Sequence, residues 1–145
     1  RLVGIDNEPY IIENSENLGL SEKIVVHDIL SSPYPEKFEA VYSLDVIEHI
    51  SLEEEHLFFS NIVSSTKENG VLMIGTPNMS ASSYASEGSR VGHINLKSFD
   101  SLKESISRYY SNVFMFGMND EVLHTGFGSM CHYLIALAVQ PINCD

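Results

Sequence analysis

Basic residues are scarce in this sequence of 145 residues, which has 8 lysines and arginines against 20 aspartates and glutamates. The formal net charge of -12 repels phosphate backbones, so the composition argues against a nucleic-acid partner. Cysteine is rare too, because only Cys131 and Cys144 are present, and they match neither a disulfide framework nor a metal-knuckle spacing. A reducing, cytoplasmic setting is therefore expected.

Long apolar runs and a signal peptide are also missing from the sequence. No apolar run approaches the length of a membrane span, so we expect no membrane partner. With 43% hydrophobic residues, the chain is nevertheless too apolar to be disordered. Its length fits a single domain over residues 1–145. Because the first residue is Arg1 and not Met, we expect this domain to be truncated at its N-terminus.

Short apolar runs alternate with helical patterns along most of the chain. Strands are expected at 1–5, 24–26, 38–43, 71–75, 112–118 and 132–139, and helices at 9–18, 51–69 and 98–110. The stretch 79–95 is rich in Ser, Gly and Ala without periodicity, so we expect a long loop there. This order predicts an α/β fold with a doubly wound, mostly parallel sheet. The last two strands are expected to form a C-terminal antiparallel hairpin at the sheet edge.

Acidic residues follow three of the expected parallel strands, where ligands of such sheets bind. Asp6, with Asn7 beside it, can accept both hydroxyls of a ribose, or it can cap the next helix. Asp28 can accept a hydrogen bond from an adenine amino group while Ile29 covers the ring. The alternative for Asp28 is a turn-forming role. Asp45 follows the third strand.

The segment 44–50 concentrates polar groups directly after that strand. It contains Asp45, Glu48 and His49, which can place a base and a carboxylate near a bound substrate. A metal site is the competing interpretation. Because Glu48 and His49 are adjacent and no second histidine follows at a close spacing, we expect no metal here.

Several segments resemble the class I S-adenosylmethionine-dependent methyltransferases, in their type 11/12, ubiquinone-biosynthesis-like branch. The resemblance covers nearly the whole chain and is carried by residues 3–6, 25–28, 38–49, 69–78 and 92–95. Residues 45–49 are its specific part, because many Rossmann-like proteins share the rest.

The resemblance implies a Rossmann-like fold, S-adenosyl-L-methionine as the cofactor and methyl transfer to a small-molecule acceptor. By position, it implies that Asp6 holds the cofactor ribose and that Asp28 holds the adenine amino group. It also implies that Ser43, Leu44 and Asp45 lie beneath the methionine portion of the cofactor.

The resemblance further implies an acceptor site built partly by the segment 76–95. His49 and His93 would position or deprotonate the acceptor, and Tyr84 and Arg90 would contact it. Arg90 can clamp an anionic substrate, or it can be a solvated loop residue. His93 can equally be a hydrogen-bonding residue of the loop.

The first strand of that family and its Gly-x-Gly-x-Gly turn have no counterpart in this sequence. In the family, that strand lies between the strands that end at Asp6 and Ser43. We therefore expect these two strands to pair directly, or a second copy to fill the gap in a homodimer. The chain alone is expected to bind the cofactor only weakly.

Two other hypotheses stay open. The chain can be an inactive fragment that serves as a methyltransferase-like association module. It can also be a nicotinamide-dependent oxidoreductase, which shares the acidic residue at the end of the first strand but does not explain residues 45–49.

Overall fold

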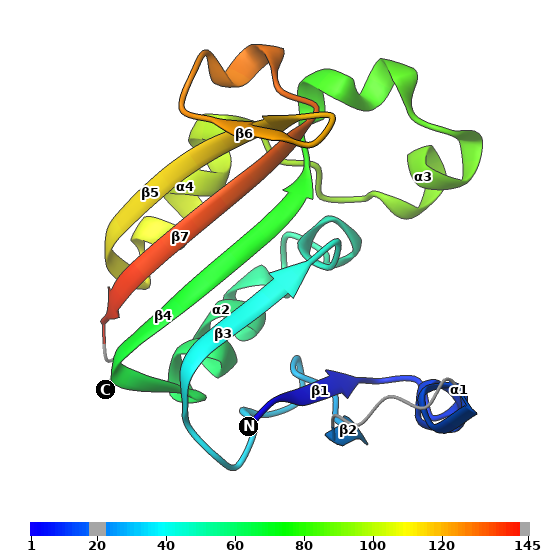
Figure 1. Cartoon of the computed structure of the whole chain (residues 1–145), viewed down its shortest axis with the longest axis vertical. Coiled ribbons are helices and arrows are strands. Elements are labelled where there is room, and N and C mark those ends of the chain that lie inside the picture. The colour runs from blue at the N-terminus through cyan, green and yellow to red at the C-terminus, as the bar shows by residue number, and fades with distance from the viewer. Residues whose placement is uncertain (18–22, 143–145) are drawn as a thin grey trace.

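The computed structural model describes residues 1–17 and 23–142 and distributes their strands over two sheets (Figure 1). β1 (Val3–Asp6) and β2 (Lys23–Val26) form a parallel pair, with α1 (Tyr10–Asn17) between them in sequence. The predicted end of α1 lies outside the described residues. The second sheet has the order β3-β4-β7-β5-β6. Its strands are β3 (Phe38–Leu44), β4 (Thr66–Pro77), β5 (Tyr110–Asn119), β6 (Val122–His124) and β7 (Tyr133–Pro141).

The directions of these strands confirm the predicted α/β class. β3 and β4 are parallel, and β5 has the same direction, because β7 lies between β4 and β5 and is antiparallel to both. The last two predicted strands therefore pair antiparallel, as expected. The prediction that this pair lies at the sheet edge is wrong, because β7 lies between β4 and β5. The edge beside β5 is formed by β6, a short strand that was not predicted. A tight turn with Asp120 in the left-handed region (φ 50°) returns the chain against β5.

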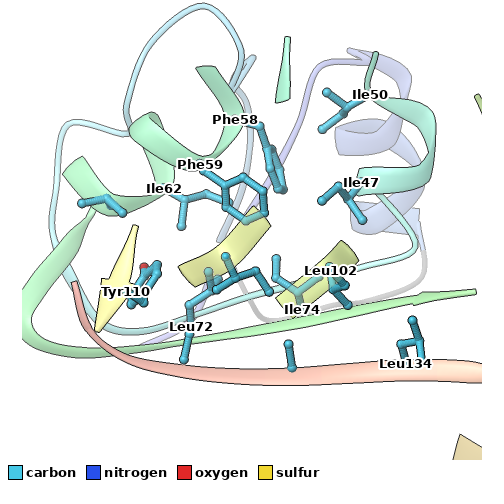
Figure 2. Close-up of a cluster of buried hydrophobic side chains, with 14 of the residues drawn as sticks. Ile47, Ile50, Phe58, Phe59, Ile62, Leu72, Ile74, Leu102, Tyr110 and Leu134 are labelled. Atoms are coloured by element: carbon cyan, nitrogen blue, oxygen red, sulfur yellow. The ribbon is translucent and has the colours of Figure 1, made fainter. Parts of the chain in front are cut away.

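The hydrophobic core lies between the five-stranded sheet and two helices on one of its faces. α2 (Glu55–Ser64) and α4 (Phe99–Ser107) both pack there (Figure 1). Phe59 of α2 and Leu134 of β7 are fully buried in this layer (Figure 2). Along β7, buried side chains alternate with partly exposed ones, the period expected when one face of a strand packs on a core.

α2 ends earlier, and β4 begins earlier, than the periodicity predicts. Two hydroxyl groups cap the last carbonyls of the helix: Ser65 Oγ donates to Asn61 O and Thr66 Oγ1 donates to Ile62 O, each over 2.7 Å. The chain can therefore leave the helix at Ser65 and enter the strand at Thr66.

The segment predicted to be a long loop contains two short helices instead. They are a 3-10 helix, η2 (Met79–Tyr84), and α3 (Glu87–Gly92). Each has a side-chain cap, because Asn78 accepts from the Ser80 N–H and Ser86 accepts from the Ser89 N–H. These caps start helices that have no apolar periodicity, which is why pattern analysis missed them. None of the helices in the described ranges has the length and apolar character needed to cross a bilayer.

β1 and β3 do not pair, which corrects the prediction that they become direct neighbours. In the part of the chain that the structure describes, β1 pairs only with β2, and β3 only with β4. The connection between β2 and β3 is tied to α2, since Asn61 Nδ2 donates to Ile29 O over 2.6 Å. Tyr34 N–H likewise donates to Ser65 Oγ over 2.9 Å. These bonds fix the connection against α2, and Figure 1 shows the small sheet separate from β3.

Candidate functional site

A cavity of about 570 Å³ lies between β1 and β3 and is lined by residues at the ends of three strands. It includes every residue predicted to contact the cofactor, namely Asp6, Asn7, Asp28, Ile29, Ser43, Leu44 and Asp45. His49 also lines it. Acidic residues from three separate strand ends therefore line one space.

The carboxylates of Asp6 and Asp28 also shape the turns that carry them. Asp6 Oδ1 accepts from the Glu8 N–H over 2.9 Å, so Asp6 supports the turn before α1 and does not cap the helix itself. Asp28 Oδ1 accepts from the Leu30 N–H over 2.9 Å, and the Ser31 hydroxyl donates to its other oxygen. The hydrogen bond from Ser31, followed by that from Leu30, lowers the pKa of Asp28. Asp28 thus has the turn-forming role as well as its place in the cavity.

Asp45 is held in an uncommon backbone conformation at the end of β3. Its φ of 55° lies in the left-handed region, and its N–H donates to Gly75 O over 3.0 Å. Gly75 leaves space that a Cβ would fill, because that atom would lie 2.6 Å from Leu44 Cδ2 and 2.8 Å from the Tyr133 hydroxyl. Burial, followed by the hydrogen bond with Asp45, raises the pKa of Tyr133, so this phenol stays a neutral donor. Tyr133 comes from the distant strand β7 and was not among the predicted site residues.

A second cavity, of about 560 Å³, lies beside η2 and α3. Tyr84, Arg90 and His93, all predicted to face the acceptor, line this cavity together with His132. Arg90 Nε donates to Ala85 O over 3.1 Å, which fixes the position of the guanidinium stem. The segment 76–95, predicted to form part of the acceptor site, therefore lines a cavity of its own.

Each of the two cavities is lined by one histidine of a neighbouring pair. His49 lines the larger cavity and His93 the smaller one, and their ring centroids lie 5.0 Å apart in an edge-to-face arrangement. His49 Nδ1 lies 3.0 Å from Gly92 O. This contact ties the 3-10 helix η1 (Ile47–His49) to the end of α3.

Glu48, which precedes His49 in η1, is fully buried (0% exposed). Thr76 Oγ1 donates to its Oε2 over 2.9 Å, while its Oε1 has no hydrogen-bond partner in the described ranges. One potential ligand atom from each of Glu48, His49 and His93 lies within 4.8 Å of the other two. Spacing along the sequence predicts no metal at Glu48 and His49, but the fold brings the distant His93 to this pair.

A buried ion pair fixes the chain just after His93. Lys97 Nζ lies 2.5 Å from Glu55 Oε2, and the two side chains are only 5% and 12% exposed. Asn95 Nδ2 donates to the same carboxylate oxygen over 2.8 Å. Burial raises the pKa of Glu55, but the hydrogen bonds from Lys97 and Asn95 outweigh it and leave that pKa below its ordinary value. The ion pair joins α2 to the chain between α3 and α4.

An open α/β sheet with carboxylates at its strand ends, around a cavity, is the arrangement found in enzymes that bind nucleotide cofactors. The model of the methyltransferase domain family matches residues 1–74 of this chain. The chain therefore belongs to the methyltransferase domain family. None of the curated proteins matches its sequence.

Solved structures of methyltransferases share the fold. The chain is 17% identical to a TehB-like S-adenosylmethionine-dependent methyltransferase from Corynebacterium glutamicum, with a TM-score of 0.69 over 95% of this chain and 67% of that one. It is 18% identical to the N-methyltransferase NodS from Bradyrhizobium japonicum, with a TM-score of 0.65 over 98% of this chain and 74% of that one. NodS has also been solved in complex with S-adenosyl-L-homocysteine.

Proposed function

We propose that this chain carries out S-adenosylmethionine-dependent methyl transfer to a small-molecule acceptor. The observation that carries the proposal is that His49 and His93, whose ring centroids lie 5.0 Å apart, each line one of the two cavities. A cofactor in the larger cavity and an acceptor in the smaller one would meet there. The family assignment and the complex of NodS with S-adenosyl-L-homocysteine support this cofactor.

The cavity between β1 and β3 has groups that suit each part of the cofactor. Asp6 and Asn7 would accept hydrogen bonds from the ribose hydroxyls. Asp28 would accept from the adenine amino group, with Ile29 against the ring. Asp45 would lie near the sulfonium, whose positive charge an ionised carboxylate stabilises.

Methyl transfer from a sulfonium requires alignment more than acid or base chemistry from the protein. The acceptor atom attacks the methyl carbon in line with the carbon–sulfur bond, and the electron pair of that bond goes to sulfur. The protein must hold the two reactants in this geometry and exclude water. Tyr84 and Arg90 would bind the acceptor, and His49 and His93 would position its reacting atom.

Thermal unfolding with candidate cofactors tests this function against its two alternatives. Millimolar S-adenosyl-L-homocysteine is expected to raise the melting temperature, because a ligand of the folded state stabilises it, whereas millimolar NAD⁺ is not. A rise with NAD⁺ alone would favour the oxidoreductase hypothesis. No rise with either ligand would favour the association module.

A second copy of the chain is the partner that we propose for the unpaired edges of β1 and β3. In the described ranges, β1 pairs only with β2 and β3 only with β4, and such open edges recruit strands. A strand of the second copy would pair along the lengths of β1 and β3 and leave their carboxyl ends, which carry Asp6 and Asp45, open to the cofactor. Light scattering is expected to give a mass of twice 16.2 kDa, and a monomer at all concentrations would refute the dimer. The cytoplasm remains the proposed compartment, because Cys131 is a buried free thiol.

A further inference from the structure

A buried carboxylate whose bonding is incomplete lies beside the two histidines that line the cavities. Glu48 is fully buried, and within the described residues its Oε1 accepts no hydrogen bond. Burial of a polar atom without a hydrogen-bond partner destabilises the folded state, so such an atom indicates a site for a further ligand. Its neighbours in space include His49 and His93, which come from separate segments.

The ring of His49 is oriented as metal-binding imidazoles usually are. Its Nδ1 faces Gly92 O at 3.0 Å, and because a carbonyl oxygen can only accept, Nδ1 must carry the proton. In a neutral ring, Nε2 then has the lone pair. Donation of the other ring N–H to a backbone carbonyl is the typical second contact of a histidine that binds a metal ion.

The three side chains supply two imidazole nitrogens and one carboxylate oxygen. We propose that Glu48, His49 and His93 bind a divalent first-row transition-metal ion of the kind of Zn²⁺ or Co²⁺. Such ions take this ligand set, and three protein ligands leave coordination positions open, as in catalytic rather than structural sites. The net charge of -12 also favours a cation.

The spacing of the cluster is close to that of an occupied site. Metal–ligand distances of about 2.0–2.2 Å place two ligands of one ion at most about 4.4 Å apart. The ligand atoms here lie within 4.8 Å of one another, so small side-chain rotations are sufficient to close the site. Glu48 O also accepts from the Asn95 N–H over 3.0 Å, which keeps the segment after His93 beside η1.

The position of the ion would define the acceptor. This step rests on the proposed function, since the ion would lie between the cofactor cavity and the acceptor cavity. An open coordination position there would take the oxygen of an acceptor hydroxyl and lower its pKa, so that its proton passes to solvent. The oxygen would then bond to the methyl carbon while the methyl–sulfur bond breaks and its electron pair stays on S-adenosylhomocysteine. A metal ion would thus replace the base role that the sequence analysis gave to the two histidines.

Titration of the chelator-treated chain with Co²⁺, followed by its visible absorption, tests the site without the cofactor. One ion per chain is expected, with an affinity that falls at least about 10-fold in Glu48→Gln and in His93→Ala. His56→Ala is the matched control, because His56 is an exposed histidine whose Nδ1 also faces a backbone carbonyl, Glu53 O, at 2.7 Å. It should leave Co²⁺ binding unchanged.

Two results would overturn the metal site. One is the absence of saturable Co²⁺ binding by the folded chain, and the other is binding that persists in both cluster variants. Thermal unfolding of each variant verifies that the fold is intact. Failure of methyl transfer with Co²⁺ bound would refute the proposed function and leave the metal site standing. Transfer that continues in the presence of excess chelator would refute the role of the ion.

Discussion

Lys97→Met is expected to lower the free energy of unfolding by about 3–5 kcal/mol at neutral pH, the usual cost of leaving one partner of a buried ion pair without the other. The variant keeps the length and apolar stem of the side chain but removes the ammonium group. The carboxylate of Glu55 then retains Asn95 as a neutral donor but has no compensating charge. Urea denaturation measures this loss.

The pH dependence separates an uncompensated charge from a simple packing defect. In the unmodified chain, the pKa of Glu55 is lower in the folded state than its ordinary value of 4.5. The ion pair therefore stabilises the fold fully at a pH above 4.5, and this stabilisation is lost as the pH falls through the pKa of the folded state. In Lys97→Met, burial without the ammonium raises the pKa of Glu55, so the neutral form is favoured in acid. The difference in free energy of unfolding between the unmodified chain and Lys97→Met should therefore decrease as the pH is lowered from 7 to about 4.

The exposed ion pair Arg108–Glu104 provides the control. Its side chains are 67% and 74% exposed, and the N–O distance is 3.0 Å. Arg108→Ala should cost at most about 0.5 kcal/mol, as exposed pairs on one helix do. Equal decreases in the free energy of unfolding of Lys97→Met and Arg108→Ala would contradict the structural role given to the buried pair.

Asp6→Asn is expected to weaken the binding of S-adenosyl-L-homocysteine about 10- to 100-fold. Hydrogen bonds to a charged group contribute about 1.5–3 kcal/mol, and an amide offers one acceptor oxygen where a carboxylate offers two. Asparagine can still accept from the Glu8 N–H, so the turn before α1 should persist. Ligand titrations followed by NMR measure affinities in the weak range expected here.

Asp100→Asn is the matched control for this prediction. Asp100 is an exposed carboxylate in the first turn of α4 and lines neither cavity. Its replacement should leave the affinity unchanged. Equal affinities in Asp6→Asn and the unmodified chain would remove Asp6 from the cofactor site.

The candidate site was predictable where it depends on strand ends. An acidic residue that directly follows a buried strand can be recognised in the sequence, and parallel strands bring such residues to one edge. Asp6, Asp28 and Asp45 line the same cavity, although β1 and β2 form one sheet and β3 belongs to the other. The segment 45–49, which carries the specific part of the family resemblance, also predicted His49 as a site residue, and His49 lines that cavity.

Contacts between distant segments could not be predicted. His93 reaches Glu48 and His49 because η2 and α3 fold the segment after β4 back onto η1, and the caps of these short helices leave no periodic pattern. Tyr133 reaches Asp45 only because β7 lies beside β4 and Gly75 leaves room for its ring. The side-chain bonds that join the connection after β2 to Asn61 and Ser65 are likewise contacts between distant segments, which sequence patterns do not specify.

The account depends most on the cavity between β1 and β3 being the cofactor site. The most direct test is a titration of the isotopically labelled chain with S-adenosyl-L-homocysteine, followed through its backbone amide NMR signals. The account predicts that the signals of residues 4–7, 28–29 and 43–46 shift together, while those of α4 and β5 stay in place. Shifts confined to other elements, or none at millimolar ligand, would contradict it.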